Sequence, residues 1–217
     1  YSRNLITSLI NNFPQHQYHL FSPGFSKSEF FDFVSSYGNV NLIEPPSYFP
    51  SLINAPWRTF IIPNKFKKLS IQLYHGLSAE LPEEFCNKRK TSKIVTIHDL
   101  IFIRYPKLYS KTDSSFYSIK TRKACKSANG ILAVSNQTAM DLQEFLKVPE
   151  EKITVIHQCC NPLFYSAINN EYLQLVKKKY NLPNEFILNV GTLEERKNAV
   201  SLIEAVGKLH NTVPIVF

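Results

Sequence analysis

Short runs of apolar and β-prone residues alternate along this chain with stretches that repeat their apolar residues at helical spacing. The runs that predict strands are residues 17–21, 40–43, 71–74, 93–97, 131–134, 153–156 and 186–190. Residues 212–217 look like the beginning of one more strand. Because strands that alternate with helices form parallel βαβ units, the pattern predicts an α/β fold with parallel sheets.

Two of the intervening helices are outlined by their apolar faces. Near the start of the chain, positions 5, 6, 9 and 10 are all Leu or Ile. Later, positions 139, 142, 145 and 146 carry apolar side chains at the same spacing. Ser135 is expected to cap the start of this second helix, and the helix should end before Pro149.

The strand expected at residues 186–190 runs directly into a turn that begins at Gly191 and contains Arg196 and Lys197. Apolar residues then recur at helical spacing from Ala199 onward. In open α/β sheets, ligands bind at the carboxyl ends of strands, and a helix start offers free N–H groups to an anion. The two cations could also lie in a solvated first turn without a ligand, although cations oppose the helix dipole there.

A polar helical stretch, residues 170–180, separates this strand from the earlier series. We therefore expect two Rossmann-like domains, at residues 1–165 and 166–217. The second would hold only its first strand, its first helix and the beginning of another strand. Because the sequence does not begin with Met and stops within an apparent strand, we expect a fragment truncated at both ends.

Composition narrows the class of protein further. The 217 residues are 44% hydrophobic, enough for real cores, and the formal net charge of +8 calls for an anionic partner such as nucleotide phosphate, nucleic acid or an acidic membrane face. Four cysteines are too few for a disulfide scaffold, and the histidines lack the spacing of a metal site. With no apolar run near 20 residues and no signal-peptide pattern, we expect a soluble, intracellular protein.

Several expected strands end on a polar residue, and parallel strands place such ends along one edge of a sheet. The residues concerned are His75, His98 with Asp99, Ser135 and His157. His75 and His157 are more typical of histidines with a structural role. His98 is the stronger candidate, because Asp99 and a long loop over residues 101–110 are expected to follow it.

The segment of residues 109–126 is strongly basic: together with Arg104 and Lys107 just before it, the neighbourhood holds seven cations and one carboxylate, Asp113. Phe116, Tyr117 and Ile119 in this segment allow two interpretations. They could form the apolar side of a helix that lies on a membrane surface. Alternatively, they pack on the sheet while the lysines are solvated.

Four motifs occur in an order that resembles a known family: VTIHDL at residues 95–100, AVS at 133–135, ITVIHQ at 153–158 and ILNVGTLEERKN at 187–198. Together they resemble glycosyltransferase family 4, which has the GT-B fold. YHGLSAELP at residues 74–82 is similar to a variant found in bacterial surface-polysaccharide enzymes. The resemblance implies an amino-terminal domain for the acceptor and a carboxyl-terminal domain for the donor, facing each other across a cleft.

The resemblance also implies retaining transfer of a sugar, of hexosyl or mannosyl type, from a nucleotide-sugar donor to a saccharide or lipid-linked acceptor in polysaccharide or lipopolysaccharide biosynthesis. No metal and no cofactor would be required. Arg196 and Lys197 would hold the donor diphosphate, Gly191 would allow close backbone approach, and Thr192 occupies a position where many members carry Arg. His98 would donate a hydrogen bond to the sugar. The protein would be cytoplasmic and could associate peripherally with the cytoplasmic membrane face.

Other functions stay open at this point. A nucleotide-sugar epimerase of GT-B fold would share the two-domain arrangement, and a non-catalytic sugar- or lipid-binding relic could keep the acceptor domain alone. A nucleic-acid-binding module is disfavoured because the lysines are spread along the chain and no recognition motif is present. The glycine-rich loop expected before Tyr1 and the paired glutamates of the donor domain are absent from this sequence. The fragment alone is therefore expected to be inactive.

Overall fold

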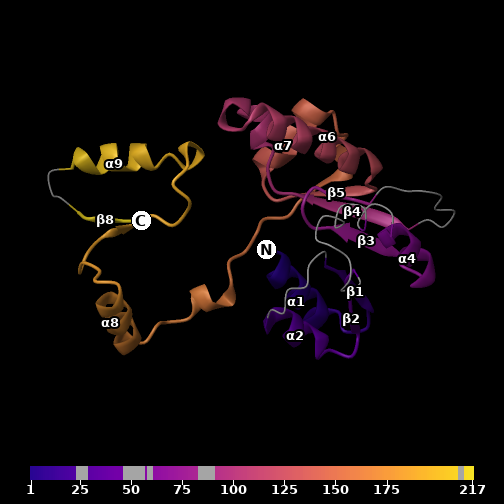
Figure 1. Ribbon diagram of the computed structural model, residues 1–217, viewed down its shortest axis with the longest axis horizontal. Coiled ribbons are helices and arrows are strands. Elements are labelled where there is room, and N and C mark those ends of the chain that lie inside the picture. Colours follow the sequence, from indigo (N-terminus) through magenta and orange to yellow (C-terminus); the bar gives the residue numbers. More distant parts are fainter. Residues whose placement is uncertain (23–28, 46–56, 58–60, 83–90, 210–212) are drawn as a thin grey trace. The chain divides into compact units, whose positions relative to one another are not determined.

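The computed structural model describes residues 1–22, 29–45, 57, 61–82, 91–209 and 213–217. The chain divides into two compact units, Tyr1–Cys159 and Cys160–Phe217 (Figure 1). This division lies a few residues before the boundary expected at 165/166. His98 belongs to the first unit, whereas the turn from Gly191 to Lys197 belongs to the second.

The strands that the structure describes in the first unit all pair in parallel, which confirms the predicted α/β class. The smaller sheet joins β1 (Tyr18–Phe21) to β2 (Val40–Ile43). The larger sheet has the order β3 (Leu73–Gly76), β4 (Ser92–Ile97), β5 (Gly130–Ala133) and β6 (Ile153–Val155). Because the spatial order follows the chain order, consecutive strands end side by side at one edge of this sheet.

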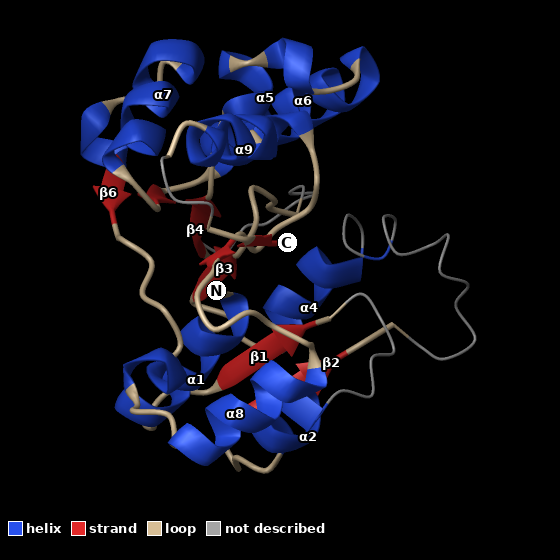
Figure 2. Cartoon of the chain, turned by 90° about the vertical axis from the view of Figure 1, so that its left-hand side faces the viewer, coloured by secondary structure: helices blue, strands red, loops and turns tan. Residues whose placement is uncertain are grey.

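Helices and short 3₁₀ turns connect these strands. They are α1 (Ser2–Asn12), α2 (Glu29–Ser35), α4 (Ile62–Lys68), α5 (Ile101–Arg104), η3 (Pro106–Leu108), α6 (Lys111–Ser127), α7 (Asn136–Leu146) and η4 (Glu150–Lys152). In Figure 2, α5, α6 and α7 lie together beside the larger sheet, and α1 and α2 lie beside β1 and β2. Each sheet of the first unit therefore has its own helical layer.

The main core of the first unit lies around β4. Val95, Ile97, Leu100, Ile131 and Leu142 are fully buried there. β4 has neighbours on both sides and is also buried at Thr96, so it lacks the polar alternation of a solvent-facing strand. A buried thiol in this core, Cys125, has its pKa raised to about 12 by burial, which keeps it protonated.

The two ends of α7 follow the sequence. Ser135 caps the helix, because its Oγ accepts a hydrogen bond of 3.1 Å from the backbone N–H of Thr138. At the other end Lys147 adopts the left-handed conformation at φ 54°, after which the chain turns toward Pro149. Both the predicted cap and the predicted end of this helix are confirmed.

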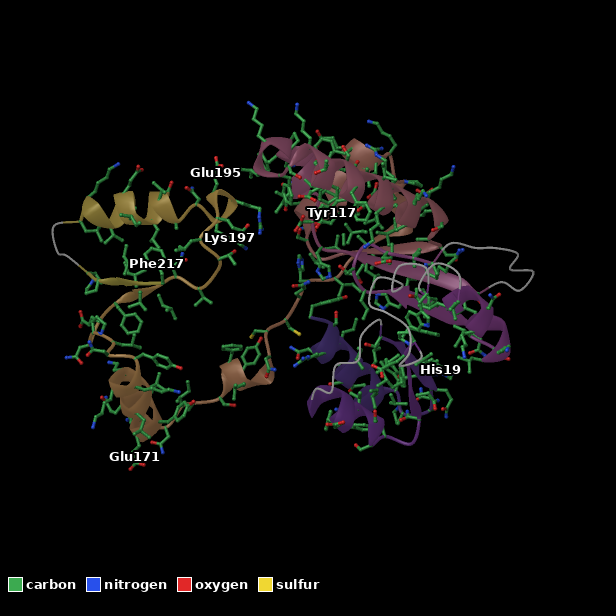
Figure 3. All side chains as sticks on the ribbon, in the orientation of Figure 1. His19, Tyr117, Glu171, Glu195, Lys197 and Phe217 are labelled. Atoms are coloured by element: carbon green, nitrogen blue, oxygen red, sulfur yellow. The ribbon has the colours of Figure 1, made fainter. Side chains whose placement is uncertain are left out.

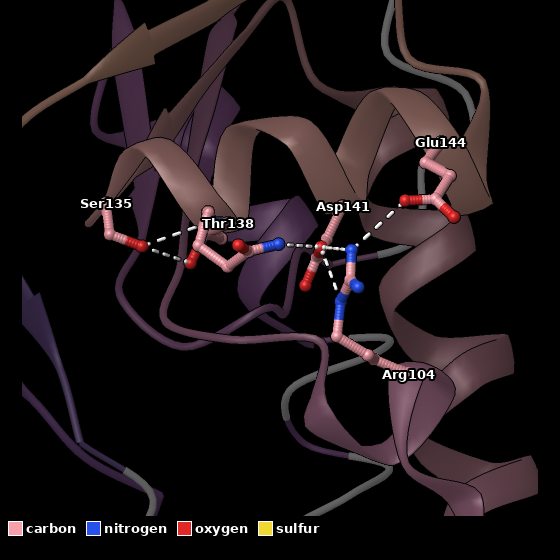
Figure 4. A network of polar contacts seen from close by, with 6 residues as sticks. Arg104, Ser135, Thr138, Asp141 and Glu144 are labelled. Atoms are coloured by element: carbon pink, nitrogen blue, oxygen red, sulfur yellow. Dashed lines mark hydrogen bonds and ion pairs between the residues drawn. The ribbon is translucent and has the colours of Figure 1, made fainter.

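An ion pair joins α5 to α7 (Figure 4). Arg104 donates to Oδ1 of the buried Asp141 from Nε at 2.9 Å and from Nη2 at 2.5 Å, and it also reaches Glu144 at 3.0 Å. Gln137 donates to the same Asp141 oxygen at 2.7 Å. The hydrogen bond with Asp141 raises the pKa of Arg104, so this buried carboxylate keeps a charged partner. The contact fixes the short helix that follows His98.

The inner side of α6 consists of small residues. Thr121, Ala124 and Cys125 are buried, whereas Phe116 and Ile119 are 63% and 58% exposed. The interpretation in which these two large side chains pack on the sheet is therefore wrong. Tyr117, labelled in Figure 3, is half-exposed. Its ring centroid lies 5.8 Å from that of Phe102.

The second unit contains one parallel strand pair with its helices. Its elements are η5 (Pro162–Tyr165), α8 (Asn170–Lys179), β7 (Ile187–Leu188), η6 (Glu195–Lys197), α9 (Ala199–Gly207) and β8 (Ile215–Val216). β7 pairs with β8 in parallel, with Ile187 opposite Ile215. The strand expected near the end of the sequence is thus present, and β7 is shorter than expected because only two residues pair.

None of the helices within the described ranges has the length and hydropathy needed to cross a bilayer.

Candidate functional site

The carboxyl end of the larger sheet gathers the polar residues that follow its strands. His98 comes directly after β4, Ser135 follows β5, and His157 follows β6. Because these three strands are parallel and adjacent, their ends share one edge, as the sequence predicted.

His75 departs from this prediction, because β3 begins two residues later than expected and His75 lies within it. The cause is Ile71, which packs against the cluster of Trp57, Ile62 and Phe66 and donates its backbone N–H to Phe66 instead of pairing with β4. His75 is instead placed beside the fully buried Thr96, with 2.8 Å between Nε2 and Oγ1. Burial lowers the pKa of His75, so its neutral form is favoured. A structural role for His75 stays a prediction, and these contacts agree with it.

His98 is held by hydrogen bonds at both ring nitrogens. Nε2 lies 3.0 Å from the carbonyl oxygen of Leu77, and Nδ1 lies 2.9 Å from the side-chain amide nitrogen of Gln158. Because a carbonyl oxygen only accepts, Nε2 carries the hydrogen, and in the neutral ring Nδ1 accepts from Gln158. The loop after β3 and the segment after β6 thus fix the orientation of the imidazole.

Two further contacts enclose His98. The ring of Tyr1 meets the imidazole edge-on, with 4.8 Å between centroids and 87° between planes, while the Tyr1 hydroxyl lies 3.0 Å from Oγ1 of Thr96. The backbone carbonyl of His98 accepts a hydrogen bond of 3.2 Å from the Thr138 hydroxyl. The side chain and the backbone of His98 are therefore held by separate parts of the first unit.

The segment after His98 is not the long loop that the sequence suggested. Asp99 accepts a hydrogen bond of 3.2 Å from the backbone N–H of Ile101, and α5 begins at that residue. A 3₁₀ turn, Pro106–Leu108, then continues toward α6. Asp99 therefore acts locally as a helix-starting residue, and the rim beside His98 is built from short helices.

Sequence reasoning missed the residues that hold His98. Leu77 acts through its backbone carbonyl, which carries no sequence signal. Gln158 could have been found, because it follows His157 after β6, which lies two strands along the sheet from β4, the strand that ends before His98. An amide at such a position can reach across the sheet edge to a neighbouring imidazole.

We expect Gln158 to control the tautomer of His98. In the intact protein, nitrogen chemical shifts of His98 should show a protonated Nε2 and an unprotonated Nδ1, since Leu77 accepts and Gln158 donates. Gln158→Leu should move the Nδ1 signal, while the signal of His16, far along the sequence in another loop, should stay unchanged. An identical His98 spectrum in the variant would contradict the contact.

The predicted residues of the second unit lie in one exposed turn after β7. Gly191 and Thr192 begin it, and a methyl group placed on Gly191 would meet no atom within 4 Å. The backbone at Gly191 is thus open to an approaching group. Glu195 and Lys197 extend from the same turn toward solvent (Figure 3).

Glu194 organises this turn. Its carboxylate accepts a short hydrogen bond from the Thr192 hydroxyl and pairs with Arg196, whose Nη2 lies 3.0 Å from Oε2. The hydrogen bond from Thr192, together with Arg196 and Lys197, holds the pKa of Glu194 below its ordinary value. Arg196 therefore already has a defined orientation.

The sequence suggested that Arg196 and Lys197 lie in the first turn of a helix. The structure shows that they do not. They belong to the 3₁₀ turn Glu195–Lys197, and α9 begins at Ala199 after Asn198, which adopts the left-handed conformation at φ 53°. The carboxylates of Glu194 and Glu195 also balance the two cations in formal charge. Any affinity of this turn for an anion must therefore come from the placement of its donors.

Within the ranges that the structure describes, no three His, Cys, Asp or Glu side chains are grouped so that they could hold a metal ion. The expectation of metal-free chemistry accordingly stays a prediction.

Comparison with known proteins places these features in context. The family model described as Glycosyltransferase Family 4 matches residues 1–162. The Escherichia coli serotype-specific mannosyltransferase WbdA is 31% identical over 122 residues, which cover 54% of this chain and 14% of WbdA. The Escherichia coli O-antigen chain mannosyltransferase B is 24% identical over 133 residues, covering 61% of this chain and 34% of that protein.

Two solved structures resemble the chain over 92% of its length. A glycosyltransferase from Rickettsia africae has a TM-score of 0.56 at 19% identity, with 51% of its own chain covered. Anabaena Alr3699/HepE, in complex with UDP and glucose, has a TM-score of 0.54 at 15% identity, with 60% covered. The α/β fold of the chain is that of the GT-B glycosyltransferases. The chain thus spans about half the length of these structures and less of the curated relatives.

Proposed function

The chain belongs to glycosyltransferase family 4, and from this premise we propose that the complete protein transfers a sugar from a nucleotide-sugar donor to a saccharide or lipid-linked acceptor. The observation that carries the proposal is the family match, which includes His98 and the whole sheet edge around it. The two Escherichia coli relatives are named as mannosyltransferases, which supports a mannosyl or related hexosyl group and a role in O-antigen-type polysaccharide synthesis. The UDP and glucose in the Anabaena structure support a nucleotide-sugar donor.

In this proposal the turn after β7 binds the donor diphosphate. Glu194 holds the guanidinium of Arg196 before the donor arrives, and the phosphate oxygens then replace Glu194 at Nη2. The guanidinium and the ammonium of Lys197 would stabilise the negative charge that grows on the leaving diphosphate as the bond to the sugar breaks. The open backbone at Gly191 gives the diphosphate room to approach.

His98 would contact the transferred sugar. Both of its ring nitrogens already have partners, so a sugar hydroxyl must replace one of them. The Gln158 contact is exposed, whereas the Leu77 contact is partly buried. We therefore expect the hydroxyl to replace Gln158 and to donate a hydrogen bond to Nδ1. From the sequence, His98 was expected to donate to the sugar, so the direction of this hydrogen bond is reversed.

Retention of configuration, independence from metal ions and a cytoplasmic location remain parts of the same proposal. Peripheral association with the membrane belongs to it as well. Retention, metal independence and the cytoplasmic location follow from the family resemblance. Membrane association follows from the charge pattern of the sequence.

The test is a donor screen on the complete protein. Labelled uridine and guanosine diphosphate sugars are incubated with a saccharide acceptor and, separately, with a lipid-linked acceptor. We expect transfer of one sugar with release of its nucleoside diphosphate, in the presence of a metal chelator. Conversion of one free nucleotide sugar into another, without transfer, would identify an epimerase instead. An absence of turnover with every donor would overturn the proposal.

A further inference from the structure

The side chain of Tyr1 connects the start of α1 to the larger sheet. The backbone carbonyl of Tyr1 accepts a hydrogen bond of 3.0 Å from the N–H of Leu5, and Ile10 of the same helix is buried in one cluster with Val40 of the smaller sheet. The Tyr1 side chain makes no capping hydrogen bond at this helix start. Its hydroxyl instead lies 3.0 Å from Oγ1 of Thr96, which is 95 residues later in the chain and belongs to β4.

Tyr1, Thr96 and His75 form a chain of hydrogen bonds. Oγ1 of Thr96 lies between the Tyr1 hydroxyl and Nε2 of His75, the second contact being 2.8 Å long. Because Thr96 is fully buried, its hydroxyl must find its partners within the protein. It carries one hydrogen, so it donates to one of these two partners and accepts from the other. The pair of Thr96 and His75 therefore holds the Tyr1 hydroxyl at a defined place.

The anchored ring of Tyr1 limits how the imidazole of His98 can move. The two rings meet edge-on, with 4.8 Å between centroids and 87° between planes, which is a favoured arrangement for aromatic pairs. In the proposed function a sugar hydroxyl replaces Gln158 at Nδ1, while the hydrogen bond from Nε2 to Leu77 remains. That single hydrogen bond would let the imidazole tilt about the line from Cγ to Nε2, and such a tilt displaces Nδ1. The neighbouring ring of Tyr1 opposes this tilt.

We propose that Tyr1 is a positioning residue that keeps the imidazole of His98 at a fixed tilt while a sugar hydroxyl is bound at Nδ1, and that Thr96 and His75 anchor Tyr1 in this position. The hydroxyl of Tyr1 is engaged by Thr96, so Tyr1 acts on His98 through its ring. The role in transfer rests on the proposed function, because it concerns the ring that contacts the sugar. The anchoring of Tyr1 is a property of the chain without any donor.

The anchoring is tested by the proton chemical shifts of the His98 ring in the full chain without donor. Tyr1→Leu removes the neighbouring aromatic ring and gives the shifts of an isolated imidazole. Tyr1→Phe and Thr96→Val each remove the hydrogen bond, so each should move the His98 signals toward those of Tyr1→Leu. Both changes together should have no larger effect than either alone, because they remove the same contact.

Tyr37→Phe is the matched control for these spectra. It removes a tyrosine hydroxyl that lies 3.1 Å from Oδ1 of Asn11, and it should leave the His98 signals unchanged. Circular dichroism confirms that every variant is folded. Unchanged His98 signals in both Tyr1→Phe and Thr96→Val would overturn the anchoring.

Kinetics of the complete protein separate positioning from general support of the fold. Tyr1→Leu should lower kcat for sugar transfer by about tenfold, since a small displacement of a group at the reacting sugar is costly. In a His98→Ala background the same change should lower kcat by less than about twofold, because no imidazole remains to be positioned. An equal loss in both backgrounds would overturn the positioning role. A protein that transfers no sugar would overturn the proposed function together with this role, whereas the His98 spectra decide the anchoring separately.

Discussion

Alanine at both Arg196 and Lys197 should lower kcat/KM of the complete protein for its nucleotide-sugar donor by on the order of a hundredfold or more. The loss should be mainly in kcat, because the negative charge on the leaving diphosphate grows in the transition state. Steady-state kinetics with a labelled donor and the acceptor identified in the screen measure both constants. The contact with Glu194 shows that the guanidinium of Arg196 is already oriented. We therefore expect the arrangement of its N–H donors to matter as much as its charge.

Three further variants resolve the roles within this turn. Arg196→Lys keeps the charge but loses the paired donors, so it should retain only part of the activity. Lys178→Ala removes an exposed cation from α8 in the same unit and should leave the kinetics unchanged. Glu194→Gln removes the carboxylate that holds Arg196 and should raise KM more than it lowers kcat. Full turnover in the double alanine variant would contradict the proposed diphosphate contact.

The sequence predicts the strands of the first unit well because their signal is local. β2 has the predicted bounds, and β4 and β5 begin one residue early, since short apolar runs of this kind are buried wherever they pair. β3 begins two residues later than predicted because Ile71 packs in the cluster around Trp57 and does not pair in the sheet. That choice depends on residues brought together from other parts of the chain, which no local pattern records.

In the candidate site, too, local sequence signals identify some residues, while contacts between distant parts of the chain are not predicted. His98 could be selected from its position after a strand, but the groups that fix its ring are a backbone carbonyl and an amide from a strand two places along the sheet. In the turn after β7, the sequence identified the two cations, Arg196 and Lys197. Glu194 and Glu195 balance their formal charge, so affinity for an anion depends on the placement of the donors and not on net charge. Side-chain pairing within a turn depends on its backbone conformation, which periodicity does not determine.

The second large effect concerns Gly76, the buried last residue of β3, where an alanine should destabilise the first unit by about 3 kcal/mol. A Cβ at this position would lie 2.0 Å from the backbone oxygen of Glu80 and 3.0 Å from Cδ2 of Leu81. A backbone atom cannot rotate away as the end of a side chain can, so the loop after β3 must shift. Urea unfolding followed by the fluorescence of Trp57, the only tryptophan and a buried residue of this unit, measures the change in the free energy of unfolding.

Gly130 provides the matched control, since it is the first residue of β5 in the same sheet. A Cβ there would meet only Cγ2 of Ile94 at 3.5 Å, an ordinary van der Waals distance, so Gly130→Ala should leave stability nearly unchanged. The loop that Gly76→Ala displaces begins at Leu77, whose carbonyl holds Nε2 of His98. The nitrogen shifts of His98 should therefore move in Gly76→Ala and stay fixed in Gly130→Ala. Equal stability of the two variants would show that the loop yields without strain, and unchanged nitrogen shifts of His98 in Gly76→Ala would contradict the dependence of the imidazole on the backbone of Leu77.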